Sequence, residues 1–288
     1  MTVQTLNDIA LLVARRYSNA LSGAATTTGT TTTLTDTTNL IQPDNAWVNH
    51  YVRFTSGAHS GAERLITESS QTNNRITWTP ALSSVVANGV TYTILPRQWI
   101  DFETAIKNAI LAAGTKWLRT KDHAIPFSIN TIEYALPADT LFLVEVFLGR
   151  PANYEWHLLS NWDVTGTLGA YKLILRADTP YPFIATPGTG DSEIRLSYVT
   201  TMKLMSSGTD TTELGALLER DAVNFIVEYA LHVLHEQAMT RNITGNAARA
   251  HFTQSRNHLQ EALRIKEMAN AVHKVPQRVK TRKIPQHI

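Results

Sequence analysis

The 288-residue chain contains no cysteine, which excludes a disulfide scaffold, a thiolate zinc site and a cysteine nucleophile. It also lacks an uninterrupted apolar run of about 18 residues, the length that a membrane-spanning helix needs. Charged residues are sparse, at 17% of the chain, but the hydrophobic fraction of 43% is ordinary and excludes wholesale disorder. A chain of this length is expected to form one large domain or two smaller ones.

The first residues also lack the pattern of a secretory signal. In Met1–Leu21 the acid Asp8 precedes the apolar run and the pair Arg15-Arg16 follows it, which is the reverse of the order in a signal peptide. We therefore expect a protein that is not secreted by that route.

Positive charge is concentrated at the C-terminus. The whole chain has 26 Lys and Arg against 24 Asp and Glu, a net charge of +2, but Val272–Ile288 contains five cations and no acid. An acidic body with a basic tail favours a tail that docks on an acidic partner over a body that grips nucleic acid. Pro276 and Pro285 forbid a continuous helix there, so we predict an extended basic arm. Two alternatives stay open, a frayed, solvated terminus and an arm that binds phosphates. The arm residues expected to bind a partner protein are Lys274, Val275, Arg278, Val279, Lys280, Arg282, Lys283 and Ile284.

The spacing of apolar residues predicts an α+β protein. It consists of a helical bundle with long C-terminal helices, a middle antiparallel β domain, and a small all-β barrel or sandwich inserted between the first two helices. The first helix is expected to end at Leu21-Ser22-Gly23, where glycine can adopt a positive φ, and a second helix is predicted over Asp101–Arg119. The predicted boundaries are 1–22 for the N-terminal helix, 23–96 for the β insert, 97–124 for the core helix, 125–205 for the middle β domain, 206–271 for the helical hairpin and 272–288 for the basic arm.

The β insert begins with a run of threonines. Threonine is β-branched and suits a pleated surface, so Ala24–Thr38 is predicted to belong to a sheet, although so biased a run is also compatible with a disordered stalk. Residues in Ala46–Phe54 alternate in polarity, and further short β-type runs lie at 64–67, 75–79 and 90–95. With turn sequences between them, these segments predict five short strands.

The middle β domain has a second set of strand patterns. Residues 129–136, 171–176 and 193–199 are predicted to be strands with one buried face, whereas Leu141–Leu148 is apolar almost throughout, as in a strand that is covered on both faces. Prolines and glycines between the last two strands predict a long connecting loop.

The two predicted C-terminal helices differ in how their apolar residues are distributed. The helix over Glu213–Met239 is apolar on more than one side, so it must be buried on several faces, which indicates contacts between subunits. The helix over Ala247–Ala271 has only a narrow apolar stripe. The residues assigned to the subunit interface are Val223, Val227, Leu231 and Leu234.

The best candidate for an enzyme centre is a group of three residues on the longer apolar helix. Glu228, His232 and His235 fall at i, i+4 and i+7, so their side chains could face one metal ion. No glutamate lies between the two histidines, which departs from the zincin pattern, and histidines on a buried helix commonly hydrogen-bond to neighbours. We therefore assign no metal, no other cofactor and no catalytic residue.

Two other features could bind or cleave a saccharide. Trp47 and Trp78 in the β insert could stack on a sugar ring, but aromatic residues at alternating strand positions more often form a core. The middle β domain holds several carboxylates, yet their spacing selects no catalytic pair. These are Glu133, Asp139, Glu145, Glu155 and Asp163.

Several short sequences occur along the chain in a characteristic order. They are Ala112-Ala113-Gly114-Thr115-Lys116-Trp117-Leu118 after the second helix, Tyr134-Ala135-Leu136-Pro137-Ala138-Asp139 before an apolar run, a tryptophan-bearing β hairpin, Ile194-Arg195-Leu196-Ser197-Tyr198, and two closing helices. This order resembles head-to-tail adaptor (connector) proteins of tailed bacteriophages. The insert, with Trp47-Val48, Arg53-Phe54, Arg64-Leu65-Ile66 and Gly89-Val90-Thr91-Tyr92, is similar to a small β module of phage virion proteins.

The resemblance implies a structural virion protein that performs no catalysis. Adaptors of this kind form a ring, usually of twelve copies, at the neck between the portal and the tail, and their C-terminal segments commonly dock on the portal. The implied partners are further copies of the chain, the portal protein, the next neck or tail component, and genomic DNA that passes the channel without sequence-specific binding. The implied location is the virion, after assembly in the host cytoplasm, with no membrane contact. The main alternative is a tail-associated carbohydrate-binding or hydrolytic protein, and a further one is a nucleic-acid-binding protein that uses the arm.

Overall fold

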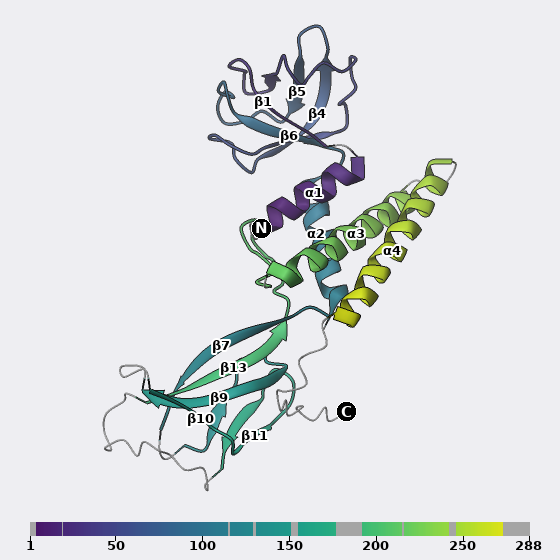
Figure 1. Cartoon of the computed structure of the whole chain (residues 1–288). Helices are drawn as coiled ribbons and strands as arrows, with labels where there is room; N and C mark the ends of the chain where they lie inside the picture. The colour runs from purple at the N-terminus through teal and green to yellow at the C-terminus, as the bar shows by residue number, and fades with distance from the viewer. Residues whose placement is uncertain are drawn as a thin grey trace. The chain divides into compact units, whose positions relative to one another are not determined.

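The computed structural model describes residues 4–18, 20–114, 116–128, 131–150, 155–176, 192–214, 216–241 and 246–272. These residues form a mixed α+β structure, which confirms the predicted class, with helices and several antiparallel sheets (Figure 1). The chain divides into two compact units. The first contains the chain up to Ala113 together with Leu204–Thr212 and Glu219–Lys266, and the second is built mainly from Gly114–Lys203. No helix among the described residues is both long enough and apolar enough to cross a bilayer.

The helices belong mainly to the first unit, where α3 and α4 pack together (Figure 1). Their bounds are Leu6–Ser18 for α1, Trp99–Ala113 for α2, Ala216–Arg241 for α3 and Asn246–Val272 for α4. A reciprocal cap begins α1: the hydroxyl of Thr5 accepts a hydrogen bond from the backbone N of Asp8 at 3.2 Å, and the Asp8 carboxylate accepts one from the backbone N of Thr5 at 2.9 Å. The helices are also tied to one another, for example where Lys266 Nζ on α4 donates to the carbonyl of Ala112 on α2 at 2.6 Å.

Two of the predicted helix ends are wrong. The first helix stops at Ser18, and Leu21–Ala24 forms strand β1, because its backbone pairs with a strand far away in the sequence, with Leu21 opposite Ile94. The second helix stops at Ala113, because Gly114 adopts a φ of 59° that a right-handed helix does not allow. Arg119, predicted at the end of that helix, therefore lies on a strand.

The β insert is a single six-stranded antiparallel sheet in the order β1-β6-β3-β4-β5-β2. Its strands are β1 (Leu21–Ala24), β2 (Thr33–Thr35), β3 (Tyr51–Phe54), β4 (Glu63–Ser70), β5 (Arg75–Thr79) and β6 (Thr91–Leu95). The edge strands β1 and β2 do not pair with each other, so the sheet curls around its own core without closing as a barrel (Figure 1). Side chains from across the sheet fill this core, including Leu34, Phe54, Trp78 and Tyr92.

The strands of the insert differ from the predicted ones in two places. It has six strands where five were expected, because β1 was assigned to the first helix. The strand predicted over Ala46–Phe54 begins only at Tyr51, since Asn45 and Asn49 adopt φ values of 61° and 66° and the chain turns between them. The threonine-rich segment forms part of the folded sheet, as the β-branched composition predicted, with β2 paired to β5.

The second unit holds two antiparallel sheets that share one hydrophobic core. The four-stranded sheet has the order β10-β9-β13-β7, and the three-stranded sheet has the order β11-β12-β8. Their bounds are Leu118–Pro126 for β7, Glu133–Ala135 for β8, Phe142–Arg150 for β9, Glu155–Leu158 for β10, Trp162–Thr165 for β11, Lys172–Leu175 for β12 and Glu193–Thr201 for β13. Leu148, Leu173 and Leu196 contribute to the core from both sheets. Because strand residues alternate between faces, the opposite face of the four-stranded sheet carries a different set of side chains.

Candidate functional site

The three predicted metal ligands lie on α3 but have different partners. The carboxylate of Glu228 accepts hydrogen bonds from Arg16 on α1 at 2.5 Å and from His258 Nδ1 on α4 at 2.7 Å. His232 Nδ1 lies 2.8 Å from the hydroxyl of Ser255 on α4. His235 Nδ1 instead lies 3.1 Å from Nδ1 of His251. The described residues contain no group of three or more His, Cys, Asp or Glu side chains with the geometry to hold a metal ion.

Histidines from both long helices surround His235. The rings of His235 and His258 are stacked with centroids 5.5 Å apart, and the ring of Tyr17 on α1 lies 4.7 Å away on centroids. Arg97 brings a positive charge to the same region, where its guanidinium donates to the hydroxyl of Tyr17 at 3.1 Å and to the carbonyl of Leu234 at 3.1 Å. We call His232, His235, His251 and His258 the histidine cluster.

Burial and nearby charged groups shift the pKa values of His235 and Glu228. Burial lowers the pKa of His235 to about 4, assisted by the positive potential of His258, His251 and Arg97, so this ring is neutral at pH 7. Burial alone would raise the pKa of Glu228, but hydrogen bonds from His258 and Arg16 outweigh it and hold the pKa below the usual value. The arrangement joins α1, α3 and α4 and resembles a structural polar network more than a catalytic centre.

The tryptophans of the β insert are differently placed. Trp78 is 1% exposed, its ring packs edge-on against Phe54 at 5.5 Å, and its Nε1 donates to the carbonyl of Thr31 at 3.2 Å. It belongs to the core of the insert and cannot stack on a sugar, so this part of the carbohydrate hypothesis is wrong. Trp47 is partly buried against the same core, in edge-on contact with His50.

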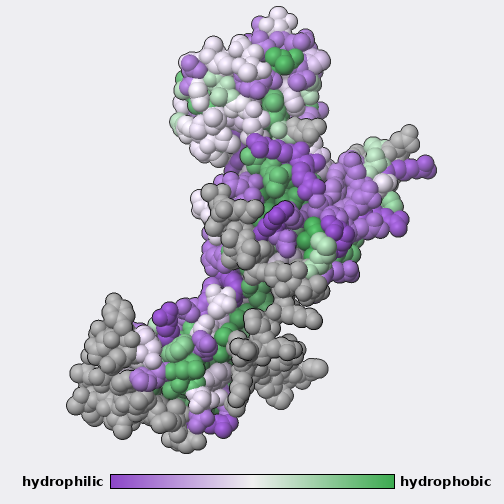
Figure 2. All heavy atoms as spheres, in the orientation of Figure 1, coloured by the Kyte–Doolittle hydropathy of each residue, from purple (hydrophilic) through white to green (hydrophobic). Residues whose placement is uncertain are grey.

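The residues predicted to form a subunit interface are buried within a single chain. Val223, Val227, Leu231 and Leu234 are exposed by 5%, 1%, 0% and 0%. The surrounding helices and loops therefore account for the apolar character of α3 without a second copy. Large apolar side chains are exposed elsewhere on the helices. The surface of the helices is largely hydrophilic in the view of Figure 2. These exposed residues are Leu12, Ile100, Leu111, Phe252, Leu263 and Met268.

The basic arm predicted over Val272–Ile288 begins at the last described residue, Val272. All of its predicted partner-binding residues, from Lys274 to Ile284, lie outside the described residues.

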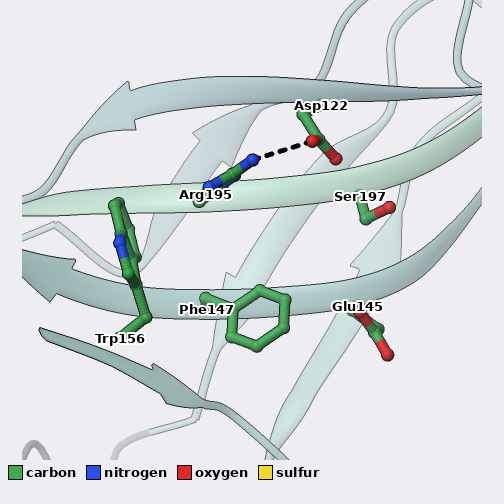
Figure 3. Close-up of a pocket in the computed structure, with 6 residues that line it drawn as sticks. All are labelled: Asp122, Glu145, Phe147, Trp156, Arg195 and Ser197. Carbon is green, nitrogen blue, oxygen red and sulfur yellow. Dashed lines mark hydrogen bonds and ion pairs between the residues drawn. The ribbon is translucent and has the colours of Figure 1, made fainter. Parts of the chain in front are cut away.

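A hollow of about 360 Å³ lies on the open face of the four-stranded sheet in the second unit (Figure 3). Two cross-strand rows of side chains build it. In the polar row, Asp122 on β7, Ser197 on β13 and Glu145 on β9 lie opposite one another on adjacent strands. In the second row, Arg195 on β13 lies opposite Phe147 on β9. The complete lining is Asp122, Glu145, Phe147, Trp156, Arg195 and Ser197.

Arg195 lines the hollow from β13, the strand between β7 and β9. Its Nη2 donates to the Asp122 carboxylate at 2.9 Å, and its guanidinium lies 5.8 Å from the centroid of the Trp156 ring (Figure 3). The side chains of Arg195 and Asp122 are 49% and 54% exposed, so the pair is accessible to solvent and contributes little to stability. The aromatic rings of Trp156 and Phe147 lie on the side of the hollow away from Asp122 (Figure 3).

The sequence pointed to only one residue of this hollow, Glu145, among five carboxylates. Three of the others belong to ion pairs outside the hollow: Glu133 with Lys172, Asp139 with Lys121 and Asp163 with Arg176. The side chain of Glu155 lies outside the described residues. The expectation that Leu141–Leu148 is covered on both faces is also wrong, because Glu145 is exposed and Phe147 is only partly buried. The polar row depends on the pairing of β13 with β7 and β9, which are distant from it in the sequence.

Comparison with known proteins adds no relative from which function can be transferred. No family model matches the sequence, and no curated protein matches it at a significant level.

Proposed function

We propose that the chain is a structural virion protein that forms a ring joining the portal to the tail of a tailed bacteriophage. In this proposal the ring encloses a channel for DNA, the basic arm docks on the portal, and the protein performs no catalysis. Twelve copies are the expected number, as in the adaptors that the sequence resembles.

The observation that carries the proposal is the order and association of the elements. A short helix, a second helix, an antiparallel β domain and a closing helical hairpin follow one another along the chain, which is the order that underlies the resemblance. The all-β insert between the first two helices departs from the plainest members of the adaptor family. Although β segments separate α1, α2 and α3 in sequence, these helices come together in one unit, as the contacts of Glu228 with Arg16 and His258 illustrate. Helices that are joined by such contacts are suited to form the wall of a ring.

The proposed ring contacts must differ from those expected from the sequence. Since Val227 and its apolar neighbours on α3 are buried within one chain, neighbouring copies have to meet through residues on the surface of the helices. Phe252 and Leu263 on α4 are 55% and 47% exposed and lie eleven positions apart, which is about three helical turns and places them on one face. A cyclic ring needs two different complementary surfaces on each copy, and this face of α4 is our candidate for one of them.

The test is the mass of the purified full-length protein in solution, measured by native mass spectrometry with and without a chelator. A closed oligomer with a mass near twelve times the 32.0 kDa of one chain, unchanged by the chelator, supports the ring. A protein that is monomeric alone and also fails to bind a purified portal contradicts the proposal. A mass that depends on the chelator would revive a metal-dependent function.

The arm is tested separately. Removal of residues 273–288 is expected to leave the ring intact and to abolish portal binding. Loss of the ring itself would contradict the assignment of the arm to the portal.

The carbohydrate-related alternative keeps little of its original basis. Trp78 is in a core, and Glu228, His232 and His235 have separate partners. We therefore propose neither the tryptophans of the β insert nor the group of Glu228, His232 and His235 as a site for a saccharide.

A further inference from the structure

We propose that the hollow on the open face of the four-stranded sheet binds a short, uncharged oligosaccharide. The site is distinct from the two tryptophans of the β insert, and it goes beyond the adaptor function and does not depend on it.

The first argument is the aromatic side of the hollow. Trp156 and Phe147 are partly buried, so their positions are fixed while part of each ring remains accessible. A sugar ring presents C–H groups on its faces, and these pack well on an aromatic surface. Leu158, two residues after Trp156 and therefore on the same face of β10, is 62% exposed and extends the apolar surface beyond the hollow.

The second argument is the mixture of donors and acceptors beside the aromatic rings. Arg195 supplies N–H donors, Asp122 and Glu145 supply carboxylate acceptors, and the Ser197 hydroxyl can do either. Sugar hydroxyls both donate and accept, so they suit such a mixed row. Because adjacent strands lie about 4.8 Å apart, the backbones at Asp122 and Glu145 are separated by about 10 Å, a span comparable to one sugar ring with its hydroxyl groups.

The third argument concerns charge. Asp122 pairs with Arg195 at 2.9 Å, so each of these two charges is partly balanced by the other. A basic peptide would bring its cations close to Arg195, and an anionic ligand would meet Glu145 and Asp122. A neutral polyhydroxylated ligand avoids both repulsions. The volume, about 360 Å³, lies at the small end of the range for ligand pockets, which favours a short saccharide.

The test is saturation-transfer difference NMR on the full-length protein, a method that works for large assemblies. The probes are glucose, galactose, rhamnose and N-acetylglucosamine and their di- to tetrasaccharides, each at up to about 10 mM because single rings bind weakly. At least one saccharide is expected to receive saturation, with the strongest effect on the ring C–H protons. Trp156→Ala should weaken its binding about tenfold or more, whereas Trp156→Phe, which keeps an aromatic ring, should retain most of it.

Glu145→Gln tests the polar row and should weaken binding about tenfold, since it removes a charged acceptor. Matched controls are Leu168→Ala, an exposed apolar residue between β11 and β12, and Glu133→Gln, an exposed carboxylate on the other sheet, and both should bind normally. The far-ultraviolet circular dichroism of each variant reports whether it is folded.

Three outcomes overturn the proposal. They are no transfer to any saccharide in the panel, transfer that persists in a folded Trp156→Ala protein, and preferential binding of a peptide with the sequence of residues 274–284 that Trp156→Ala abolishes. The last result would make the hollow a docking site for a basic peptide. None of these outcomes affects the mass measurement that tests the ring.

Discussion

The Glu63 carboxylate in the β insert caps helix α2, because both of its oxygens accept hydrogen bonds from the backbone N of Trp99, at 3.0 and 3.2 Å. Arg53, on the adjacent strand β3, places its guanidinium 4.3 Å from the centroid of the Trp99 ring. The insert is thus connected to the helices by specific contacts as well as by the two points where the chain passes between them. The negative charge of Glu63 also interacts favourably with the positive end of the α2 dipole.

Glu63→Ala is therefore expected to destabilise the first unit although Glu63 is in a strand. Loss of a helix cap costs about 1 kcal/mol, equivalent to a fall of about 2–4 °C in the melting temperature of a unit of this size. Differential scanning calorimetry measures the effect. Glu68→Ala, an exposed glutamate on the same strand, is the matched control and should melt like the unchanged protein. Equal melting temperatures for the two variants would show that the cap contributes nothing.

The histidine cluster predicts a loss of stability in mild acid. In the folded protein the pKa of His235 is about 4, below the value of about 6.5 for an unfolded histidine, so the unfolded chain binds a proton first as the pH falls. Stability should decline between about pH 6.5 and 4, by about 3 kcal/mol at most. Glu228, whose folded pKa is also lowered, adds a loss only at lower pH, because its unfolded pKa is 4.5.

The check is urea denaturation of the helical unit at pH 7.5, 6, 5 and 4.5. His235→Asn should make the free energy of unfolding depend less on pH, even if it lowers that free energy at pH 7.5. His123→Asn, at an exposed position on β7, should leave the slope unchanged. A slope that is the same in all three proteins would contradict the role of His235.

Glu228 is expected to be the most sensitive single residue of this network. It is 6% exposed and binds Arg16 and His258 at once, so Glu228→Ala removes two charge-assisted hydrogen bonds that join three helices. A loss of about 2–3 kcal/mol is expected. A double-mutant cycle with Arg16→Ala separates the two contacts. If the losses of stability from Glu228→Ala and Arg16→Ala simply add in the double variant, the contact between Glu228 and Arg16 contributes nothing to stability.

The threonine-rich segment offers a test of whether the insert folds as one sheet. Leu34, on β2, is fully buried in the core of the insert, so Leu34→Ala should cost about 2–5 kcal/mol and make residues 24–40 sensitive to a protease. Ile41→Ala, at an exposed position just beyond this segment, is the control. Cleavage of the unchanged protein at the same rate as Leu34→Ala would indicate a disordered stalk.

Periodicity in the sequence predicted most elements but could not determine which segments pair. Residues 75–79 and the two C-terminal helices lie close to their predicted positions, because each has a strong local pattern. The pattern extended the first helix to Leu21-Ser22-Gly23 and the second to Arg119. Leu21–Ala24 and Leu118–Pro126 are strands instead, because their conformation depends on pairing with β6 and β13, which are distant in the sequence.

The candidate sites show the same limitation. The i, i+4 and i+7 spacing correctly placed Glu228, His232 and His235 on one helix, but the sequence could not indicate that α4 supplies His251, His258 and Ser255 as their partners. In the second unit, Trp156, Arg195 and Asp122 become neighbours only through the strand order β10-β9-β13-β7. The sequence predicted that α3 is buried on several sides. It could not show that other parts of the same chain, rather than a second copy, cover these sides, because this depends on the tertiary structure.

The exposed face of α4 gives the last prediction, which concerns the proposed ring. Phe252→Asp and Leu263→Asp each place a charge on this face and should prevent assembly, because a buried unpaired carboxylate costs several kcal/mol at an interface. The monomers should remain folded, since both side chains are already about half exposed. Asn257→Asp is the matched control, because it introduces the same carboxylate at an exposed position on a different side of the same helix. Native mass spectrometry measures the number of copies directly. Rings that persist in both Phe252→Asp and Leu263→Asp would exclude this face of α4 from the subunit contact. Loss of rings in the control as well would indicate that any added charge on α4 prevents assembly.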